Sequence, residues 1–130
     1  MKKFDTVIIG GGIGGLMAAY RLRKNSPDMT IAITERGNEL NKRVCPASKN
    51  NTCVHCKICS ITSGFAGAGA FSDGKFNLGT AYGGTLGEEL GDDVANLYIN
   101  EVDKILVEYC TSGVPKVYES NDELRLKCIQ

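Results

Sequence analysis

Three glycines near the start of the chain have the spacing of a phosphate-binding turn. Gly10, Gly12 and Gly15 form G-x-G-x-x-G directly after a short apolar run. In such a turn the first glycine allows a tight bend, the second lets backbone approach a pyrophosphate, and the third lets a helix pack closely on a strand. Unpaired N–H groups at the start of that helix then face the phosphates. The spacing therefore predicts that residues 10–15 bind the pyrophosphate of a dinucleotide.

An acidic residue lies where such a unit places its ribose contact. Glu35 follows the apolar run Thr30–Thr34 and lies 20 residues after Gly15. A carboxylate there accepts hydrogen bonds from ribose hydroxyls and repels a 2′-phosphate, which favours FAD or NAD over NADP. The alternative is a glycine-rich turn without a ligand. The strand, the helix and the acid at the right distance weigh against that alternative.

Four cysteines follow with the spacing of a metal or redox site. Cys45, Cys53, Cys56 and Cys59 form C-P-x6-C-x2-C-x2-C. Thiolates at such short steps can converge on one centre, and four of them suit zinc or an iron–sulfur cluster. A redox dithiol beside a flavin, or reduced cysteines without chemistry, stay open as alternatives. His55 lies within the group but is left out of the ligand set, because a single histidine is usually a polar loop residue.

A second glycine-rich stretch, residues 64–91, comes after the cysteines. Small residues let backbone pass flat against a ring system. We expect Ser72 and Lys75 to hydrogen-bond or polarise the polar edge of a flavin. The alternative is a glycine-rich loop packed on the sheet.

The elements that must position these residues alternate between strand and helix. We expect a buried parallel strand at Phe4–Ile9, a helix at residues 16–24 and a second strand at Thr30–Thr34. Residues 36–63 lack periodicity and read as an irregular excursion, and residues 64–91 as mostly loop.

A long amphipathic helix is predicted to follow the loop. Apolar residues recur at three- and four-residue steps from Asp92 to about Cys110, with Gly113 at the C-cap and Pro115 after it. Residues 116–118 fit a short strand, and Asn121 fits the N-cap of a last helix. We expect Cys110 and Cys128 to be buried or semi-buried thiols without chemistry.

The predicted fold class is α/β, a Rossmann-like βαβ unit with an incomplete doubly wound parallel sheet. Only two parallel strands are recognisable, whereas such a sheet needs about five or six. No second domain that could hold a substrate is recognisable either. We therefore interpret residues 1–130 as the N-terminal portion of an FAD/NAD(P)-binding domain from a larger protein.

Charge and hydropathy give no argument for a nucleic-acid or membrane partner. The chain has 15 basic and 15 acidic side chains and a formal net charge of zero, so no general attraction to polyanions follows. No stretch approaches the ~20 apolar residues of a membrane span. Asp5 and the glycines interrupt the first apolar run, which argues against a secretory signal, so we expect a cytoplasmic protein.

Several of these runs together resemble a known superfamily. Val7–Gly15, Thr34–Gly37 and Lys42–Pro46 are similar to flavoprotein oxidoreductases of the glutathione-reductase-like superfamily. The narrower block Gly64–Lys75, just after C-x2-C-x2-C, resembles the FAD-dependent dehydrogenases often labelled NAD(FAD)-utilizing dehydrogenases. The resemblance covers nearly the whole chain and implies FAD bound in an extended form.

The resemblance also implies roles for single residues. It implies that the glycine turn faces the pyrophosphate and that Glu35 contacts the adenosine ribose. It also implies that Arg36 lies beside the adenine and that Arg43 lies near the pyrophosphate. It brings residues 72–75 toward the flavin. The expected cofactor-binding residues are Gly10, Gly12, Ile13, Gly14, Gly15, Glu35, Arg36, Arg43, Ser72, Asp73, Gly74 and Lys75. The expected metal ligands are Cys45, Cys53, Cys56 and Cys59.

The leading hypothesis is the FAD-binding part of a flavin-dependent oxidoreductase. The flavin would do the redox chemistry, with NAD(P)H as a candidate electron partner and an unidentified small molecule or redox protein as substrate. The alternatives are a non-enzymatic metal-binding module on a Rossmann scaffold and a simple NAD-binding domain. Residues 64–75 favour flavin, because a simple NAD unit needs no glycine-rich return after its second strand. No catalytic residue is recognisable, and we expect this chain by itself to be inactive.

Overall fold

The computed structural model describes residues 2–115. It divides into two compact units, the first ending at Lys75 and the second beginning at Phe76. Every predicted site residue lies in the first unit. The predicted strand at residues 116–118, the predicted helix cap at Asn121 and Cys128 lie outside the described residues.

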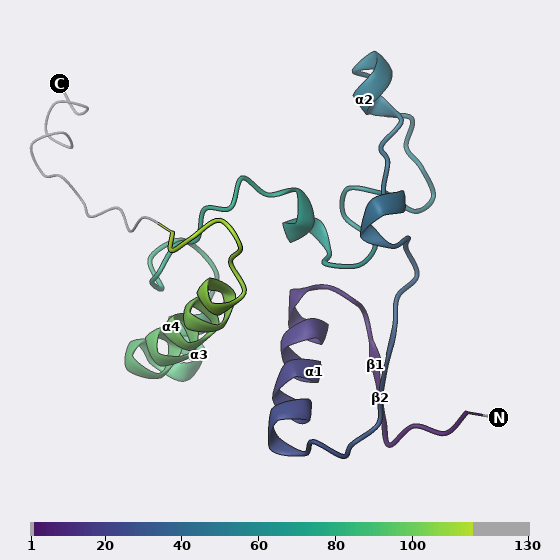
Figure 1. The fold of residues 1–130 in the computed structure, drawn as a ribbon. Coiled ribbons are helices and arrows are strands. Elements are labelled where there is room, and N and C mark those ends of the chain that lie inside the picture. Colours follow the sequence, from purple (N-terminus) through teal and green to yellow (C-terminus); the bar gives the residue numbers. More distant parts are fainter. Residues whose placement is uncertain (1, 116–130) are drawn as a thin grey trace, which may run out of the picture. The chain divides into compact units, whose positions relative to one another are not determined.

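A parallel βαβ arrangement opens the first unit (Figure 1). Its elements are strand β1 (Thr6–Ile9), helix α1 (Ile13–Asn25) and strand β2 (Ile31–Thr34). The strands pair with Thr6 opposite Ile31 and Ile9 opposite Thr34. Parallel pairing needs a crossover connection, which α1 supplies. The predicted order of strand, glycine turn, helix, strand and acid is therefore confirmed, and with it the α/β class with an incomplete parallel sheet.

Asp5 and Thr30 close the end of the strand pair that lies away from the glycine turn. The N–H and the hydroxyl of Thr30 donate to Asp5 Oδ2 at 2.8 and 2.6 Å. The Asp5 N–H donates in return to the Thr30 carbonyl at 3.0 Å. The Thr30 hydroxyl, then the Thr30 N–H, holds the pKa of Asp5 below its usual value, because bonds to the charged form favour that form. This reciprocal set of bonds fixes the register of the two strands.

The strands are half-exposed, so the expectation of a buried strand at Phe4–Ile9 is wrong. Val7 is 55% exposed and Ile9 is 90% exposed. Helix α1 packs against both strands. Within residues 2–115 the sheet has two strands, so its edges and much of its surface stay open. The strand also begins at Thr6, because the backbone of Asp5 bonds at the strand entry rather than within the ladder.

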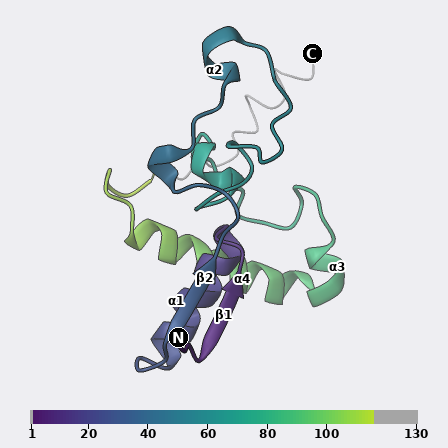
Figure 2. The same cartoon turned by 90° about the vertical axis from the view of Figure 1, so that its right-hand side faces the viewer.

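Residues 36–63 form the irregular excursion that the sequence predicts, with two short helical turns. These are a 3-10 turn at Leu40–Lys42 and helix α2 at Ala47–Asn50. Helix α2 stands at the end of the excursion far from the strands in both views (Figures 1 and 2). Asn51 ends α2 in the left-handed conformation, with φ +55°. The second glycine stretch then adds a further 3-10 turn at Ala68–Phe71.

The second unit contains a pair of helices. They are α3 (Leu86–Leu90) and α4 (Asp92–Glu108). Gly91 joins them with φ +80°, a backbone conformation that favours glycine. Asp92 and Asp93 lie in the first turn of α4, where the helix dipole favours negative charge. The Thr80 hydroxyl donates to Asp92 Oδ1 at 2.7 Å and ties the preceding loop to this helix.

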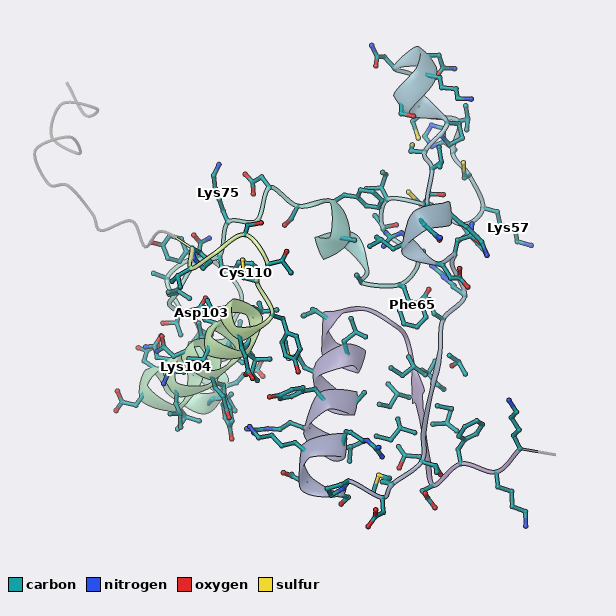
Figure 3. All side chains as sticks on the ribbon, viewed as in Figure 1. Lys57, Phe65, Lys75, Asp103, Lys104 and Cys110 are labelled. Atoms are coloured by element: carbon teal, nitrogen blue, oxygen red, sulfur yellow. The ribbon has the colours of Figure 1, made fainter. Side chains whose placement is uncertain are left out.

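The residue that caps the C-terminal end of α4 differs from the predicted one. The helix ends at Glu108 with Tyr109 as its C-cap, so Gly113 does not cap it. Gly113 has φ +92° but lies in the turn beyond. Cys110, which Figure 3 labels, is exposed, and this corrects the expectation of a buried or semi-buried thiol. Among residues 2–115 no helix combines the length and apolar character needed to cross a membrane.

Candidate functional site

A cleft of about 500 Å³ opens at the carboxyl ends of β1 and β2. In open parallel sheets, ligands bind outside this end of the strands. The glycine turn contributes Gly10 and Gly12 to the cleft, and the end of β2 contributes residues 34–36. The opposite wall consists of residues 62–64 and Gly67. Three segments that are separate in the sequence therefore meet around one space.

The glycine turn presents the N-terminus of α1 to this cleft. Gly12 is the N-cap, and the Leu16 N–H donates to its carbonyl at 3.0 Å. The N–H groups of Ile13, Gly14 and Gly15 therefore precede the first helical hydrogen bond. No side chain caps the helix, and its first turn has no acidic residue. These N–H groups and the positive end of the helix dipole suit an anion such as a pyrophosphate.

The three motif glycines have different structural requirements. Gly10 has φ +105°, so it makes the tight bend that the motif predicts. A Cβ at Gly15 would collide with the Gly10 carbonyl oxygen, so Gly15 allows the helix to pack closely. A Cβ at Gly12 would meet only Gly67 Cα, at 3.9 Å. The fold itself therefore leaves the space beside Gly12 open.

Glu35 connects the end of β2 to the glycine turn. Its Oε2 accepts from the Gly11 N–H at 2.8 Å, and its Oε1 accepts from the Gly37 N–H at 2.8 Å. The Gly11 N–H, then the Gly37 N–H, holds the pKa of Glu35 below its usual value. The backbone N–H groups of Gly64 and Arg36 lower this pKa in the same direction. The link to the turn is a role that the sequence does not predict.

The second glycine stretch folds back onto the first. The Ala66 N–H donates to the Gly11 carbonyl at 2.8 Å. A Cβ at Gly67 would lie 3.2 Å from Gly12 Cα, so the two backbones approach closely. The structure thus brings the start of the Gly64–Lys75 block to the cleft.

The other end of that block, Ser72–Lys75, forms an exposed local turn. Ser72 Oγ accepts from the Gly74 N–H at 3.0 Å. Lys75 Nζ lies 2.9 Å from Asp73 Oδ2, and these two side chains are 82% and 65% exposed. None of the four residues lines the cleft, and Figure 3 labels Lys75 on this exposed segment. The structure does not bring them to the other site residues, and their contact with a flavin stays a prediction.

The two arginines that the resemblance assigns to the cofactor differ in their positions. Arg36 lines the cleft, and its Nη2 donates to Ser63 Oγ at 3.3 Å. Arg43 is 4% exposed, donates to three backbone carbonyls and does not line the cleft. The structure therefore places Arg43 inside the fold, with three of its N–H donors bonded to the chain.

The four cysteines of the excursion are free thiols. Cys45 is half-buried, and Cys53, Cys56 and Cys59 are exposed. Within residues 2–115 no group of three His, Cys, Asp or Glu side chains has an arrangement that could hold a metal ion. The backbone N–H groups of Thr62 and Ile61 and the Thr62 hydroxyl hold the pKa of Cys59 below its usual value. The metal site stays a prediction from the spacing alone.

Three hydroxyl side chains of the cleft were not expected from the sequence. They are Thr34, Thr62 and Ser63. Thr34 ends β2, and its hydroxyl donates to the Ile8 carbonyl at 3.4 Å. Thr62 and Ser63 directly precede Gly64, and that adjacency to the glycine stretch is the one signal that could have found them.

Comparisons with known proteins agree with this geometry. Residues 8–55 match the family described as NAD(P)-binding Rossmann-like domain. A stretch of 55 residues is 38% identical to "L-2-hydroxyglutarate dehydrogenase, mitochondrial" of Dictyostelium discoideum and covers 42% of this chain and 12% of that protein. A stretch of 31 residues is 64% identical to "Thiamine thiazole synthase" of Candida albicans (strain WO-1) and covers 24% of this chain and 9% of that protein. No solved structure matches the sequence.

The parallel βαβ unit and the family match define the class of this segment. Residues 8–55 form a Rossmann-like segment, and the family that they match is described as NAD(P)-binding. The chain spans only a small part of the curated relatives it matches, 12% and 9% of their lengths. A dinucleotide cofactor is the partner that this class implies.

Proposed function

We propose that the chain is the FAD-binding part of a flavin-dependent oxidoreductase and that the cleft holds the ADP portion of FAD. The observation behind the proposal is that three features meet in one cleft: the N-terminus of α1, the Glu35 carboxylate and the wall formed by residues 62–64 and Gly67. The first suits a pyrophosphate and the second suits ribose hydroxyls. The third is glycine-rich backbone that can lie close to a flat group.

The residues present fit the ADP portion of such a cofactor. The open space beside Gly12 admits a phosphate against the backbone, and the N–H groups of Ile13–Gly15 supply donors. Glu35 lines the cleft at the end of β2, where its carboxylate is the acceptor for ribose hydroxyls. When bound, FAD supplies the redox chemistry by hydride or electron transfer, while the protein binds and orients it.

The relatives support an oxidoreductase. One of them is named a dehydrogenase, with 38% identity over 55 residues. The resemblance of Gly64–Lys75 to FAD-dependent dehydrogenases favours flavin, because that block lies beyond the matched residues 8–55 and folds back onto the glycine turn. The activity and substrate of the whole protein are part of the proposal.

A second candidate is a domain that binds NAD without flavin. The description of the matching family, which names NAD(P), favours it. The two candidates share the ADP portion and therefore the same cleft. They differ in what lies beyond the pyrophosphate, since only FAD adds an isoalloxazine ring.

The visible spectrum of the purified intact protein, followed by titration with FAD and with NAD, separates the candidates. We expect flavin absorbance that denaturation releases, and uptake of FAD by protein from which the flavin has been removed. A colourless protein that binds NAD but not FAD would overturn the flavin proposal in favour of the second candidate. Binding of neither nucleotide would overturn both.

A further inference from the structure

Arg43 is a buried charged side chain that donates to three backbone carbonyls of the chain itself. It is 4% exposed. Its Nε donates to the Ser60 carbonyl at 2.9 Å, its Nη2 to the Ile61 carbonyl at 2.7 Å and its Nη1 to the Phe65 carbonyl at 2.5 Å. The guanidinium carbon lies 4.7 Å from the centre of the Phe71 ring. Burial of a charge is costly unless hydrogen bonds compensate it, and here three carbonyls do so.

The carbonyls that Arg43 holds lie on both sides of the cleft wall. Ser60 and Ile61 come directly before residues 62–64, and Phe65 comes directly after them. Residues 62–64 line the cleft. One rigid, planar group therefore fixes both ends of a three-residue wall.

The packing around Gly64 brings the wall against the arginine stem. A Cβ at Gly64 would lie 2.6 Å from Arg43 Cδ and 2.7 Å from the Asn38 carbonyl oxygen. Gly64 itself has φ +129°, which favours glycine. The wall continues into Ala66, whose N–H donates to the Gly11 carbonyl at 2.8 Å. Arg43 thus acts on the position of the wall relative to the glycine turn.

We propose that Arg43 is a positioning residue of the dinucleotide cleft. It does not contact the ligand; it holds residues 62–64 at the distance from the glycine turn that the ADP portion requires. The inference rests on the proposed function, since it names a residue that shapes the same site. Lysine cannot replace it, because one ammonium group lacks the planar fork that reaches separate carbonyls.

Titration of the intact protein with ADP, after removal of any bound nucleotide, tests the inference. Arg43→Lys keeps the charge and most of the apolar stem, and Arg43→Ala removes the group. We expect Arg43→Lys to bind ADP about tenfold more weakly, because displaced residues 62–64 would lose one or two hydrogen bonds to ADP. The matched control is Arg23→Ala, which removes an exposed arginine in the last turn of α1, whose Nη1 donates to the Met29 carbonyl at 3.1 Å. That control should bind ADP like the wild type.

Two further readouts separate positioning from a general loss of structure. Amide hydrogen exchange at residues 62–65 should be faster in Arg43→Lys, while exchange within α1 should match the wild type. Added ethylguanidinium should restore ADP binding to Arg43→Ala, because it can refill the vacated site.

The outcomes are distinguishable. Wild-type affinity for ADP in Arg43→Lys, or unchanged exchange at residues 62–65, would overturn the inference and leave the proposed function intact. Failure of the wild-type protein to bind ADP would overturn the proposed function, and the positioning role with it.

Discussion

At Gly12 the fold and the proposed ligand have different requirements. Its φ is −75°, a value that other residues adopt readily. A Cβ there would meet only Gly67 Cα, at an ordinary contact distance of 3.9 Å. The protein can therefore accommodate alanine, whereas a pyrophosphate lying against this backbone cannot.

We expect Gly12→Ala to keep the wild-type melting temperature and to weaken ADP binding by at least about tenfold. Calorimetric titration and a thermal melt of the intact protein measure the two effects. Gly79→Ala is the control, because its Cβ would meet only a Tyr82 ring atom at 4.0 Å in the other unit. Equal ADP affinity in Gly12→Ala and the wild type would show that this turn does not hold the pyrophosphate.

Glu35 makes the stability of the first unit depend on pH. Its carboxylate accepts hydrogen bonds from Gly11 and Gly37, which lower its pKa in the folded protein. A folded-state pKa below the unfolded value means that the charged form stabilises the fold. This contribution is fully present above the unfolded pKa and is lost as the pH falls through the folded pKa.

We expect Glu35→Gln to unfold at a lower denaturant concentration than the wild type at pH 7. The difference should shrink below about pH 4.3, where the glutamate of the unfolded chain becomes protonated. Unfolding curves from pH 7 to acid pH measure it. Glu39→Gln, at an acid that is 67% exposed, should differ little from the wild type. A difference for Glu35→Gln that does not change with pH would show that the charge is not what stabilises the turn.

The sequence predicts the elements that depend on neighbouring residues, but it does not predict the cleft wall, which depends on contacts between residues far apart in the chain. The βαβ order and the start of α4 follow from apolar periodicity and from glycine spacing, which report on neighbouring residues. The cleft wall depends on Arg43 binding carbonyls that lie 17 to 22 residues later in the chain. Periodicity carries no information on such distant contacts, so the sequence predicts neither the place of Thr62 and Ser63 in the cleft nor the bonds of Arg43 to the chain.

Gly37 marks the closest approach between the end of β2 and the cleft wall. A Cβ at Gly37 would lie 2.5 Å from Gly64 N, 2.6 Å from Gly64 Cα and 2.7 Å from the Ser63 carbonyl carbon. All three atoms belong to the backbone, which cannot move aside as a flexible side chain can.

We expect Gly37→Ala to lower the free energy of unfolding by about 1–3 kcal/mol, the usual effect of overpacking. Chemical denaturation of the intact protein measures it. Gly69→Ala makes the same chemical change, but a Cβ at Gly69 would have no atom within 4 Å. This control should therefore change the free energy of unfolding little. If both variants unfold at the wild-type midpoint, the segments do not pack as closely as described.

At the scale of the whole molecule, the excursion between the two glycine stretches has little packing of its own. Its regular structure amounts to the turn at Leu40–Lys42 and α2 at Ala47–Asn50. Arg43 holds the base of the excursion through the Ser60 carbonyl. Between these ends lie Cys45, half-buried, and three exposed cysteines.

A metal bound by Cys45, Cys53, Cys56 and Cys59 would order this segment, because binding energy at such a site is also folding energy. Within residues 2–115 no three of these side chains are arranged to hold a metal, so binding would draw the excursion together. We expect anaerobically purified intact protein to hold about one zinc ion or one iron–sulfur cluster per chain. Elemental analysis together with the visible spectrum measures the metal and tells zinc from iron.

The pattern of metal loss among variants tests which cysteines act as ligands. Cys56→Ser should lose the metal and should make residues 45–59 more sensitive to proteolysis, since it removes the middle ligand of C-x2-C-x2-C. Cys110→Ser is the control, because Cys110 is an exposed cysteine of the other unit. Less than about a tenth of an equivalent of zinc and iron together in wild-type protein, with all four thiols reactive, would leave redox chemistry or no chemistry as their role.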